Sequence, residues 1–143
     1  MSGIRNLLGW GLLFFIGIAA AVVPAQAETR LALVIGNSDY KHTTRLDNPA
    51  NDARLISEAL QQIGFTVHSH TDLEQKPLGR AVAAFARKVK DAGPDTMALL
   101  YYAGHGLQVN GTNFLVPVDA RIEDEADVPL ESVSANDVFH TLR

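Results

Sequence analysis

A histidine between two glycines, Gly104-His105-Gly106, is the part of this sequence best suited to chemistry. It follows the apolar and aromatic run "ALLYYA" without a break. An imidazole exchanges a proton near neutral pH and can therefore act as a general acid or base. The two glycines allow a tight backbone path and a close approach, and the amide of Gly106 could donate a hydrogen bond to a developing oxyanion. The alternative is a turn histidine whose glycines serve conformation alone.

Two further histidines, His68 and His70, alternate on a predicted strand and therefore face the same side. Such a pair could suit zinc, but two ligands without a third nearby do not make a site, and surface histidines of an edge strand are the simpler interpretation. The acidic segment 123–127, "EDEAD", lacks the alternating spacing and glycine of an EF-hand loop and is interpreted as a solvated loop. We assign no metal ion and no cofactor.

Composition limits the possible functions. The chain has 143 residues, 47% of them apolar, which is enough for one modest domain with a core. Its formal net charge of −4 gives no basic surface of the kind that binds nucleic acid. It contains no cysteine, so it has neither a disulfide nor a thiol nucleophile of its own.

Residues 1–27 have the pattern of a secretory signal peptide. Arg5 is followed by an apolar run from Leu7 to Val23 and then by "PAQA", which offers small residues for cleavage after Ala27. We therefore expect an exported protein, periplasmic or extracellular, whose mature domain is 28–143. An uncleaved membrane anchor is the alternative, and a membrane is expected as a partner in that case alone.

Alternating strands and helices precede the histidine. Buried strands are predicted at 31–36, 65–70 and 96–102 from their apolar or β-branched runs. A helix is predicted from Pro49, with Asn48 as its cap and Gly64 as its stop, and a second at 76–91. This order implies right-handed crossovers and a parallel sheet, at whose carboxyl edge His105 would lie.

The remaining segments carry local signals. Asn110-Gly111 between two apolar stretches predicts a hairpin. Ser134 and Asp137 have the spacing of a capping box, which predicts a final helix from Ser134. The adjacent residues Tyr101 and Tyr102 should lie on opposite faces of their strand.

Three segments together resemble the caspase-like cysteine peptidases, and within them the bacterial branch related to metacaspases. They are "LALVIGNSDY", "LDNPANDARLISEALQQIGFTV" and "DTMALLYYAGHGLQVNGTNFLVPVDA", so that the resemblance runs from about Arg30 to the end. It implies the N-terminal part of an open α/β domain, with a mostly parallel sheet and helices on both faces. Two departures are Ala103, where some metacaspases carry serine, and Pro49, where several relatives carry cysteine.

The resemblance also implies roles for three residues. His105 would be the general base of a cysteine–histidine dyad, and the Gly106 amide would help to form the oxyanion hole. Asp52 would shape a pocket that favours arginine or lysine before the cleaved bond; its alternative role is simply that of an acid at a helix start, where the macrodipole favours it. The partner thiolate would lie in a "D-x-C" motif after the next strand, beyond Arg143.

These implications lead to one main hypothesis and two alternatives. The chain is predicted to be the N-terminal portion of an exported caspase-like endopeptidase, acting on a peptide or protein substrate but inactive alone because it lacks the thiolate. A catalytically inactive binding or regulatory module is the first alternative. A metal-dependent hydrolase using His68, His70 and His105 is the second. With the next strand missing, the sheet should also keep an unpaired edge and fold poorly.

Overall fold

The computed structural model describes residues 28–141. The predicted signal peptide, residues 1–27, lies outside this range. Within 28–141, no helix has the length and apolar character that crossing a membrane would require.

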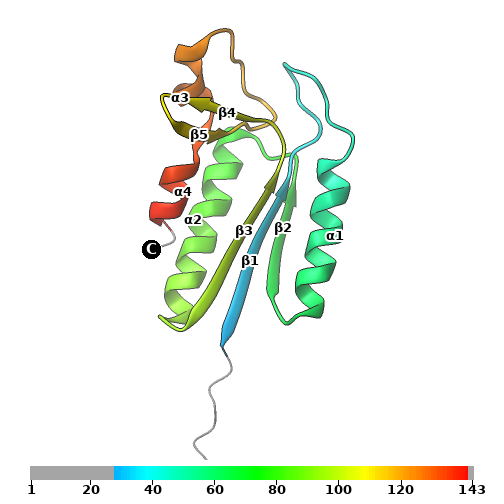
Figure 1. Cartoon of the computed structure of the whole chain (residues 1–143), viewed down its shortest axis with the longest axis vertical. Helices are drawn as coiled ribbons and strands as arrows, with labels where there is room; N and C mark the ends of the chain where they lie inside the picture. Colours follow the sequence, from blue (N-terminus) through cyan, green and yellow to red (C-terminus); the bar gives the residue numbers. More distant parts are fainter. Residues whose placement is uncertain (1–27, 142–143) are drawn as a thin grey trace, which may run out of the picture.

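Three parallel strands form the central sheet. Strand β1 (Thr29–Gly36) lies between β2 (Thr66–Thr71) and β3 (Thr96–Ala103), in the order β2-β1-β3 (Figure 1). The last six residues of β1 are buried, as expected for a strand that is covered on both faces. The predicted strands begin and end within two residues of the observed ones.

Helices cover both faces of this sheet, which confirms the predicted α/β class. Helix α1 (Pro49–Gln62) lies on one side and α2 (Gln75–Ala92) on the other (Figure 1). Because side chains alternate along β1, one set packs with α2 and the other with α1. The first cluster includes Leu33, Ile35, Leu78, Phe85 and Tyr102, and the second includes Ala32, Val34, Ala53, Leu60 and Tyr101. The two adjacent tyrosines thus lie on opposite faces, as predicted.

A small antiparallel sheet stands beyond the carboxyl ends of the central strands. It consists of β4 (Gly106–Val109), β5 (Thr112–Leu115) and β6 (Val133–Ser134). The predicted hairpin is confirmed: Asn110 and Gly111 both have positive φ, 49° and 78°, as a type I′ turn requires. Between β5 and β6 lie a 3₁₀ turn, η1 (Glu125–Asp127), and the short helix α3 (Val128–Glu131). Strand β6 had no signal in the sequence.

Two predictions about helix starts have different outcomes. Asn48 does not cap α1 through its side chain, because its backbone is already helical (φ −97°, ψ −29°); instead the Ser38 hydroxyl accepts the Ala50 N–H at 3.1 Å. The hydroxyl of Ser134 does accept the Asp137 N–H, at 3.3 Å, at the start of α4 (Ala135–Thr141).

The segment 123–127, interpreted as a solvated loop, is exposed but more ordered than a plain loop. The side chain of Asp124 accepts the Ala126 N–H at 2.8 Å, and Asp127 accepts those of Glu123 and Asp124, so that η1 has a capping box. These backbone N–H donors also hold the pKa of Asp127 below its usual value. The carboxylates of Asp124 and Asp127 are therefore hydrogen-bonded within their own turn.

Candidate active site

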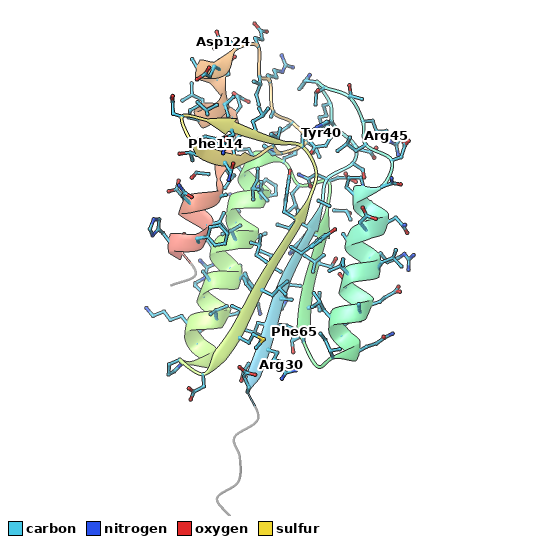
Figure 2. All side chains as sticks on the ribbon, in the orientation of Figure 1. Arg30, Tyr40, Arg45, Phe65, Phe114 and Asp124 are labelled. Carbon is cyan, nitrogen blue, oxygen red and sulfur yellow. The ribbon has the colours of Figure 1, made fainter. Side chains whose placement is uncertain are left out.

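His105 lies two residues beyond β3, directly before β4, at the carboxyl edge of the central sheet. Its ring packs edge-on against the ring of Tyr40, with centroids 4.4 Å apart and planes inclined by 60°. Figure 2 shows Tyr40 in this upper region, at the end of the sheet from which the loops emerge. The structure therefore places the predicted base where parallel sheets gather their functional groups.

The imidazole of His105 is held by a backbone carbonyl. Its Nε2 lies 2.7 Å from the Thr44 oxygen, in the loop between β1 and α1. A carbonyl oxygen can accept a hydrogen bond but cannot donate one, so Nε2 must carry the proton. In the neutral ring, Nδ1 then carries the lone pair that can accept a proton.

Two tyrosine hydroxyls bind the backbone of the same histidine. The Tyr40 hydroxyl accepts the His105 N–H at 2.7 Å, and the Tyr102 hydroxyl donates to the His105 carbonyl at 3.0 Å. Both hydroxyls also reach the Val116 carbonyl, at 3.2 and 2.8 Å, and they lie 3.3 Å from each other. Burial is the main reason why the pKa of each tyrosine lies above its usual value.

Asn37 joins the loops around this cluster. It follows β1 directly and is fully buried. Its amide nitrogen donates to the carbonyls of Val116 (3.3 Å) and Leu73 (3.4 Å), and its oxygen accepts the Leu73 N–H at 2.9 Å. Its own N–H donates to the Ala103 carbonyl at 2.8 Å. Asn37 thereby satisfies backbone polar groups of three other chain segments, those that contain Leu73, Ala103 and Val116.

The two glycines beside His105 have different surroundings. A Cβ on Gly104 would lie 2.5 Å from the Tyr40 hydroxyl and 2.6 Å from that of Tyr102, so the predicted close approach is confirmed there. A Cβ on Gly106 would meet nothing closer than the Phe114 carbonyl, at 3.6 Å, among the described residues. Neither glycine has positive φ, so neither is required by a left-handed backbone conformation.

The amide of Gly106 points away from its neighbouring strand. Val116 donates to the His105 carbonyl at 3.1 Å, which makes His105 and Val116 a hydrogen-bonded position of the hairpin. Bonded and non-bonded positions alternate in antiparallel pairs. The next pair, Gly106 with Leu115, is therefore non-bonded, and its N–H groups face outward.

Asp52 lies in the first turn of α1, where its N–H donates to the Asn48 carbonyl. This turn is pressed against the end of β1: a Cβ on Gly36 would lie 2.4 Å from the Pro49 carbonyl and 2.8 Å from the Ala53 Cβ. Gly36 in turn pairs with the last residue of β3. Asp52 is half-buried, and its carboxylate has no hydrogen bond or ion pair within residues 28–141.

The histidines of β2 are not part of this cluster. Strand β1 separates β2 from β3, and the ring of His68 faces Phe85 of α2, with centroids 6.3 Å apart. Burial, Lys88 and His70 hold the pKa of His68 below its usual value. Across the described part of the chain, no three His, Cys, Asp or Glu side chains come together as metal ligands would. The metal-dependent alternative thus gains no support there.

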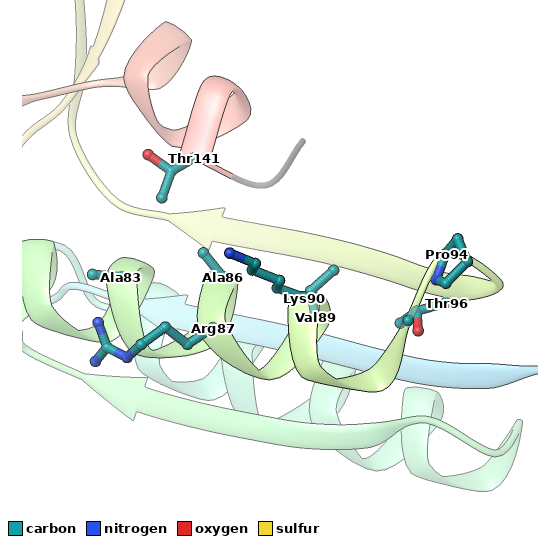
Figure 3. Close-up of a pocket in the computed structure, with 9 residues that line it drawn as sticks. Ala83, Ala86, Arg87, Val89, Lys90, Pro94, Thr96 and Thr141 are labelled. Carbon is teal, nitrogen blue, oxygen red and sulfur yellow. The ribbon is translucent and has the colours of Figure 1, made fainter.

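A groove lies at the other end of β3. It encloses about 730 Å³ between α2, the start of β3 and the end of α4 (Figure 3). Its wall is mainly apolar, with two cationic side chains; its residues are Ala83, Ala86, Arg87, Val89, Lys90, Gly93, Pro94, Thr96 and Thr141. Because Thr96 and Ala103 are the two ends of β3, this groove is separated from His105 by the length of the strand.

Sequence reasoning missed three residues of the site. Asn37, Tyr40 and Thr44 all belong to the polar segment that follows the first predicted strand, and this segment has no periodic pattern. An aromatic residue in an otherwise polar loop was the available signal for Tyr40. Nothing local identifies Thr44, because it acts through its backbone carbonyl.

Comparisons with known proteins agree on one family. A family model described as the caspase domain matches residues 29–143. Mucosa-associated lymphoid tissue lymphoma translocation protein 1 of Homo sapiens is 39% identical over 94 residues, which cover 66% of this chain and 11% of that protein.

Two further relatives are more distant. Caspase-1 of Rattus norvegicus is 30% identical over 87 residues, 61% of this chain and 21% of that protein. A paracaspase of Dictyostelium discoideum is 28% identical over 102 residues, 68% of this chain and 25% of that protein. The chain thus spans a quarter or less of each relative's length, and the narrower metacaspase-related branch stays a prediction. With the α/β fold and the match over nearly all of its described residues, the chain belongs to the caspase family and has a caspase-like fold.

Proposed function

We propose that this chain supplies the histidine half of the active site of a caspase-type cysteine endopeptidase. The observation that carries the proposal is the hydrogen bond from Nε2 of His105 to the Thr44 carbonyl, 2.7 Å long. It reserves Nδ1 for proton transfer and prevents the ring from turning. This is the arrangement that a base needs beside a thiol.

The chemistry would follow the acyl-transfer scheme. Nδ1 takes the proton of a cysteine thiol, and the thiolate sulfur forms a bond with the peptide carbonyl carbon. The C–N bond then breaks, and the imidazolium returns the proton to the leaving amine. Water hydrolyses the resulting thioester. Because this chain has no cysteine, the thiol must come from outside these 143 residues.

Gly106 is proposed as the oxyanion donor. Its outward-facing amide is not used by the hairpin, and its missing Cβ leaves space that the protein's own packing does not require. A carbonyl oxygen that becomes negatively charged could occupy this space and accept the N–H.

Asp52 is proposed as the acidic residue of a pocket for arginine or lysine. Its carboxylate is half-buried and has no partner among residues 28–141, and the packing at Gly36 holds its helix turn against the carboxyl edge of the sheet. A guanidinium can make a paired, charge-assisted hydrogen bond with such a group. A substrate aspartate would be repelled.

The test uses the reading frame that contains this chain. If it continues past codon 143 into a strand that bears cysteine, the product should cleave arginyl fluorogenic peptides, and His105→Ala should abolish turnover. The 143-residue chain alone should give only background. Turnover that survives in His105→Ala would overturn the assigned role, and a stop codon directly after 143 would favour an inactive binding module.

Specificity is tested in that longer product. Asp52→Ala should lower kcat/KM for arginyl substrates by about 30-fold or more, since losing one partner of a desolvated pair costs roughly 2 to 5 kcal/mol. The matched control is Glu58→Ala, in the same helix, whose carboxylate is already paired with Arg54. Equal cleavage by Asp52→Ala and the parent would show that the pocket is built from other residues.

Export remains a further proposal, supported by the pattern of residues 1–27. N-terminal sequencing of secreted material should begin at Glu28 with "ETRLALV". A retained Met1 with membrane association would identify the segment as an anchor.

A further inference from the structure

We propose that the hydroxyls of Tyr40 and Tyr102 close a ring of hydrogen bonds on the peptide groups of His105 and thereby keep its imidazole on the Thr44 carbonyl. We call these two residues the tyrosine clamp. They are positioning residues, because they act through the backbone of His105. The importance of the clamp for catalysis rests on the proposed function, whereas the clamp itself can be tested without turnover.

The clamp replaces a bond that the hairpin would otherwise make. A hydrogen-bonded antiparallel pair exchanges two N–H···O=C bonds. Between His105 and Val116 one is present, from the Val116 N–H to the His105 carbonyl at 3.1 Å. In place of the other, the Tyr40 hydroxyl accepts the His105 N–H at 2.7 Å and lies 3.2 Å from the Val116 carbonyl. A side chain from a remote loop thus occupies a position of the ladder.

The directions of the protons follow from the partners. The Tyr102 hydroxyl has one proton and faces two carbonyls, those of Val116 (2.8 Å) and His105 (3.0 Å), which can only accept. Its proton is therefore shared between these two carbonyls, and its oxygen can only accept from Tyr40, 3.3 Å away. The single Tyr40 proton is shared between the Tyr102 oxygen and the Val116 carbonyl, which lies 3.2 Å from the Tyr40 hydroxyl. Tyr40 in turn accepts from the His105 N–H. The chain of bonds begins at the His105 N–H and returns to the His105 carbonyl.

Steric and electrostatic features support this arrangement. Only a residue without Cβ fits beside the two hydroxyls at position 104, because a Cβ would come within 2.6 Å of both. Tyr40 is 8% exposed, and Tyr102 packs against the core on the α2 face. Burial raises the pKa of both phenols, so both keep the protons that the ring of bonds needs.

The clamp influences the position of the imidazole through the loop between β1 and α1, which contains both Tyr40 and Thr44. Tyr40 binds the histidine's backbone, and Thr44, four residues later, binds its ring. The intervening Lys41 N–H donates to the Val118 carbonyl at 2.8 Å. Thr44 itself is exposed. Removing the Tyr40 hydroxyl therefore detaches one of the points that keep the Thr44 carbonyl opposite Nε2.

The experiment is a ¹⁵N NMR measurement on the 143-residue chain. In the wild type, neutral His105 should be protonated at Nε2, with a detectable Nε2–H proton. Tyr40→Phe retains the ring contact but removes the hydroxyl. It should raise the exchange rate of the Nε2–H proton about fivefold or more, the factor that corresponds to one net hydrogen bond, and increase the Nδ1–H fraction. Tyr102→Phe should act in the same direction.

The matched control is Tyr101→Phe, on the opposite face of β3, whose hydroxyl makes no hydrogen bond within residues 28–141. It should leave the His105 signals unchanged. Folded Tyr40→Phe and Tyr102→Phe proteins with wild-type Nε2–H exchange and tautomer ratio would overturn the proposal.

A wild-type measurement covers the case in which the variants do not fold. Both clamp hydroxyl protons should exchange slowly enough to be observed, and the Tyr40 proton should show a cross-peak to the His105 amide proton. Their absence from wild-type protein whose dispersed NMR spectrum shows that it is folded would also overturn the proposal. None of these readouts depends on peptidase activity, so failure of the clamp and failure of the proposed function are separate results.

Discussion

The two ends of β3 differ in how completely their polar groups are satisfied. At the carboxyl end, the peptide groups of His105 bind two tyrosine hydroxyls, and Asn37 joins the neighbouring loops. At the amino end, the Thr96 hydroxyl is buried without a hydrogen-bond partner among the described residues, and Met97 is 43% exposed. The groove of Figure 3 opens beside this end.

This contrast distinguishes the part of the domain whose polar groups are satisfied by its own residues from the part whose polar groups remain unpaired. The surroundings of His105 are organised by residues of this chain. The outer edge of β3, by contrast, pairs with no strand within residues 28–141, as the sequence led us to expect (Figure 1). Its unpaired N–H and C=O groups invite association with another strand, and the poor folding of the isolated chain stays a prediction.

The largest effect is expected at the carboxyl end. Gly104→Ala should destabilise the fold by about 1–3 kcal/mol, because the new Cβ must displace two hydrogen-bonded tyrosine hydroxyls. The measurement is urea unfolding followed by circular dichroism. The control is Gly79→Ala in α2, where a Cβ meets nothing within 4 Å; it should stabilise by about 0.5–1 kcal/mol. Equal effects of the two substitutions would remove the contrast between the tightly packed site and its surroundings.

A smaller effect is expected at alkaline pH. Burial raises the pKa of Tyr102 in the folded state, whereas the unfolded value is about 10. Below pH 10 both states keep the proton, and the full stability is present. Above pH 10 the unfolded state loses it first, so stability should fall by up to about 1.4 kcal/mol per pH unit from this residue.

Unfolding measured between pH 9 and pH 11.5 tests this prediction. This pH range includes the pKa of tyrosine in the unfolded state, about 10, at which the loss of folding stability should begin. Tyr102→Phe should flatten the decline relative to the wild type, and Tyr101→Phe serves as the comparison from the other face of the sheet. Identical slopes in the wild type and in Tyr102→Phe would show that the clamp does not hold its proton as described.

The smallest effect, with the opposite sign, is expected at the amino end. Thr96→Val replaces a buried hydroxyl that has no partner within residues 28–141 by a methyl group of similar size. It should stabilise the fold by roughly 0.5–1 kcal/mol, because an unsatisfied polar group is removed from the interior. Thr66→Val, at the exposed first position of β2, should change stability by less than about 0.5 kcal/mol. Destabilisation by Thr96→Val, seen in thermal unfolding, would mean that the hydroxyl has a partner.

The sequence by itself determined the α/β order, the hairpin at Asn110-Gly111 and the position of His105 after a strand. These features follow from local patterns: the period of apolar residues, the turn preference of Asn-Gly and the breaks at glycine and proline. The short strand β6 escaped this reasoning because two residues carry no periodicity.

Only the tertiary structure decided what surrounds His105. Tyr40 lies 65 positions from it and Thr44 lies 61 positions away, and no local pattern links residues so far apart. The protonated nitrogen of the ring was likewise decided by a backbone carbonyl, a group that every residue has. Residue types and spacing could therefore identify the histidine, but its tautomer and orientation arise from contacts that exist only once β1, β3 and their loops have packed together.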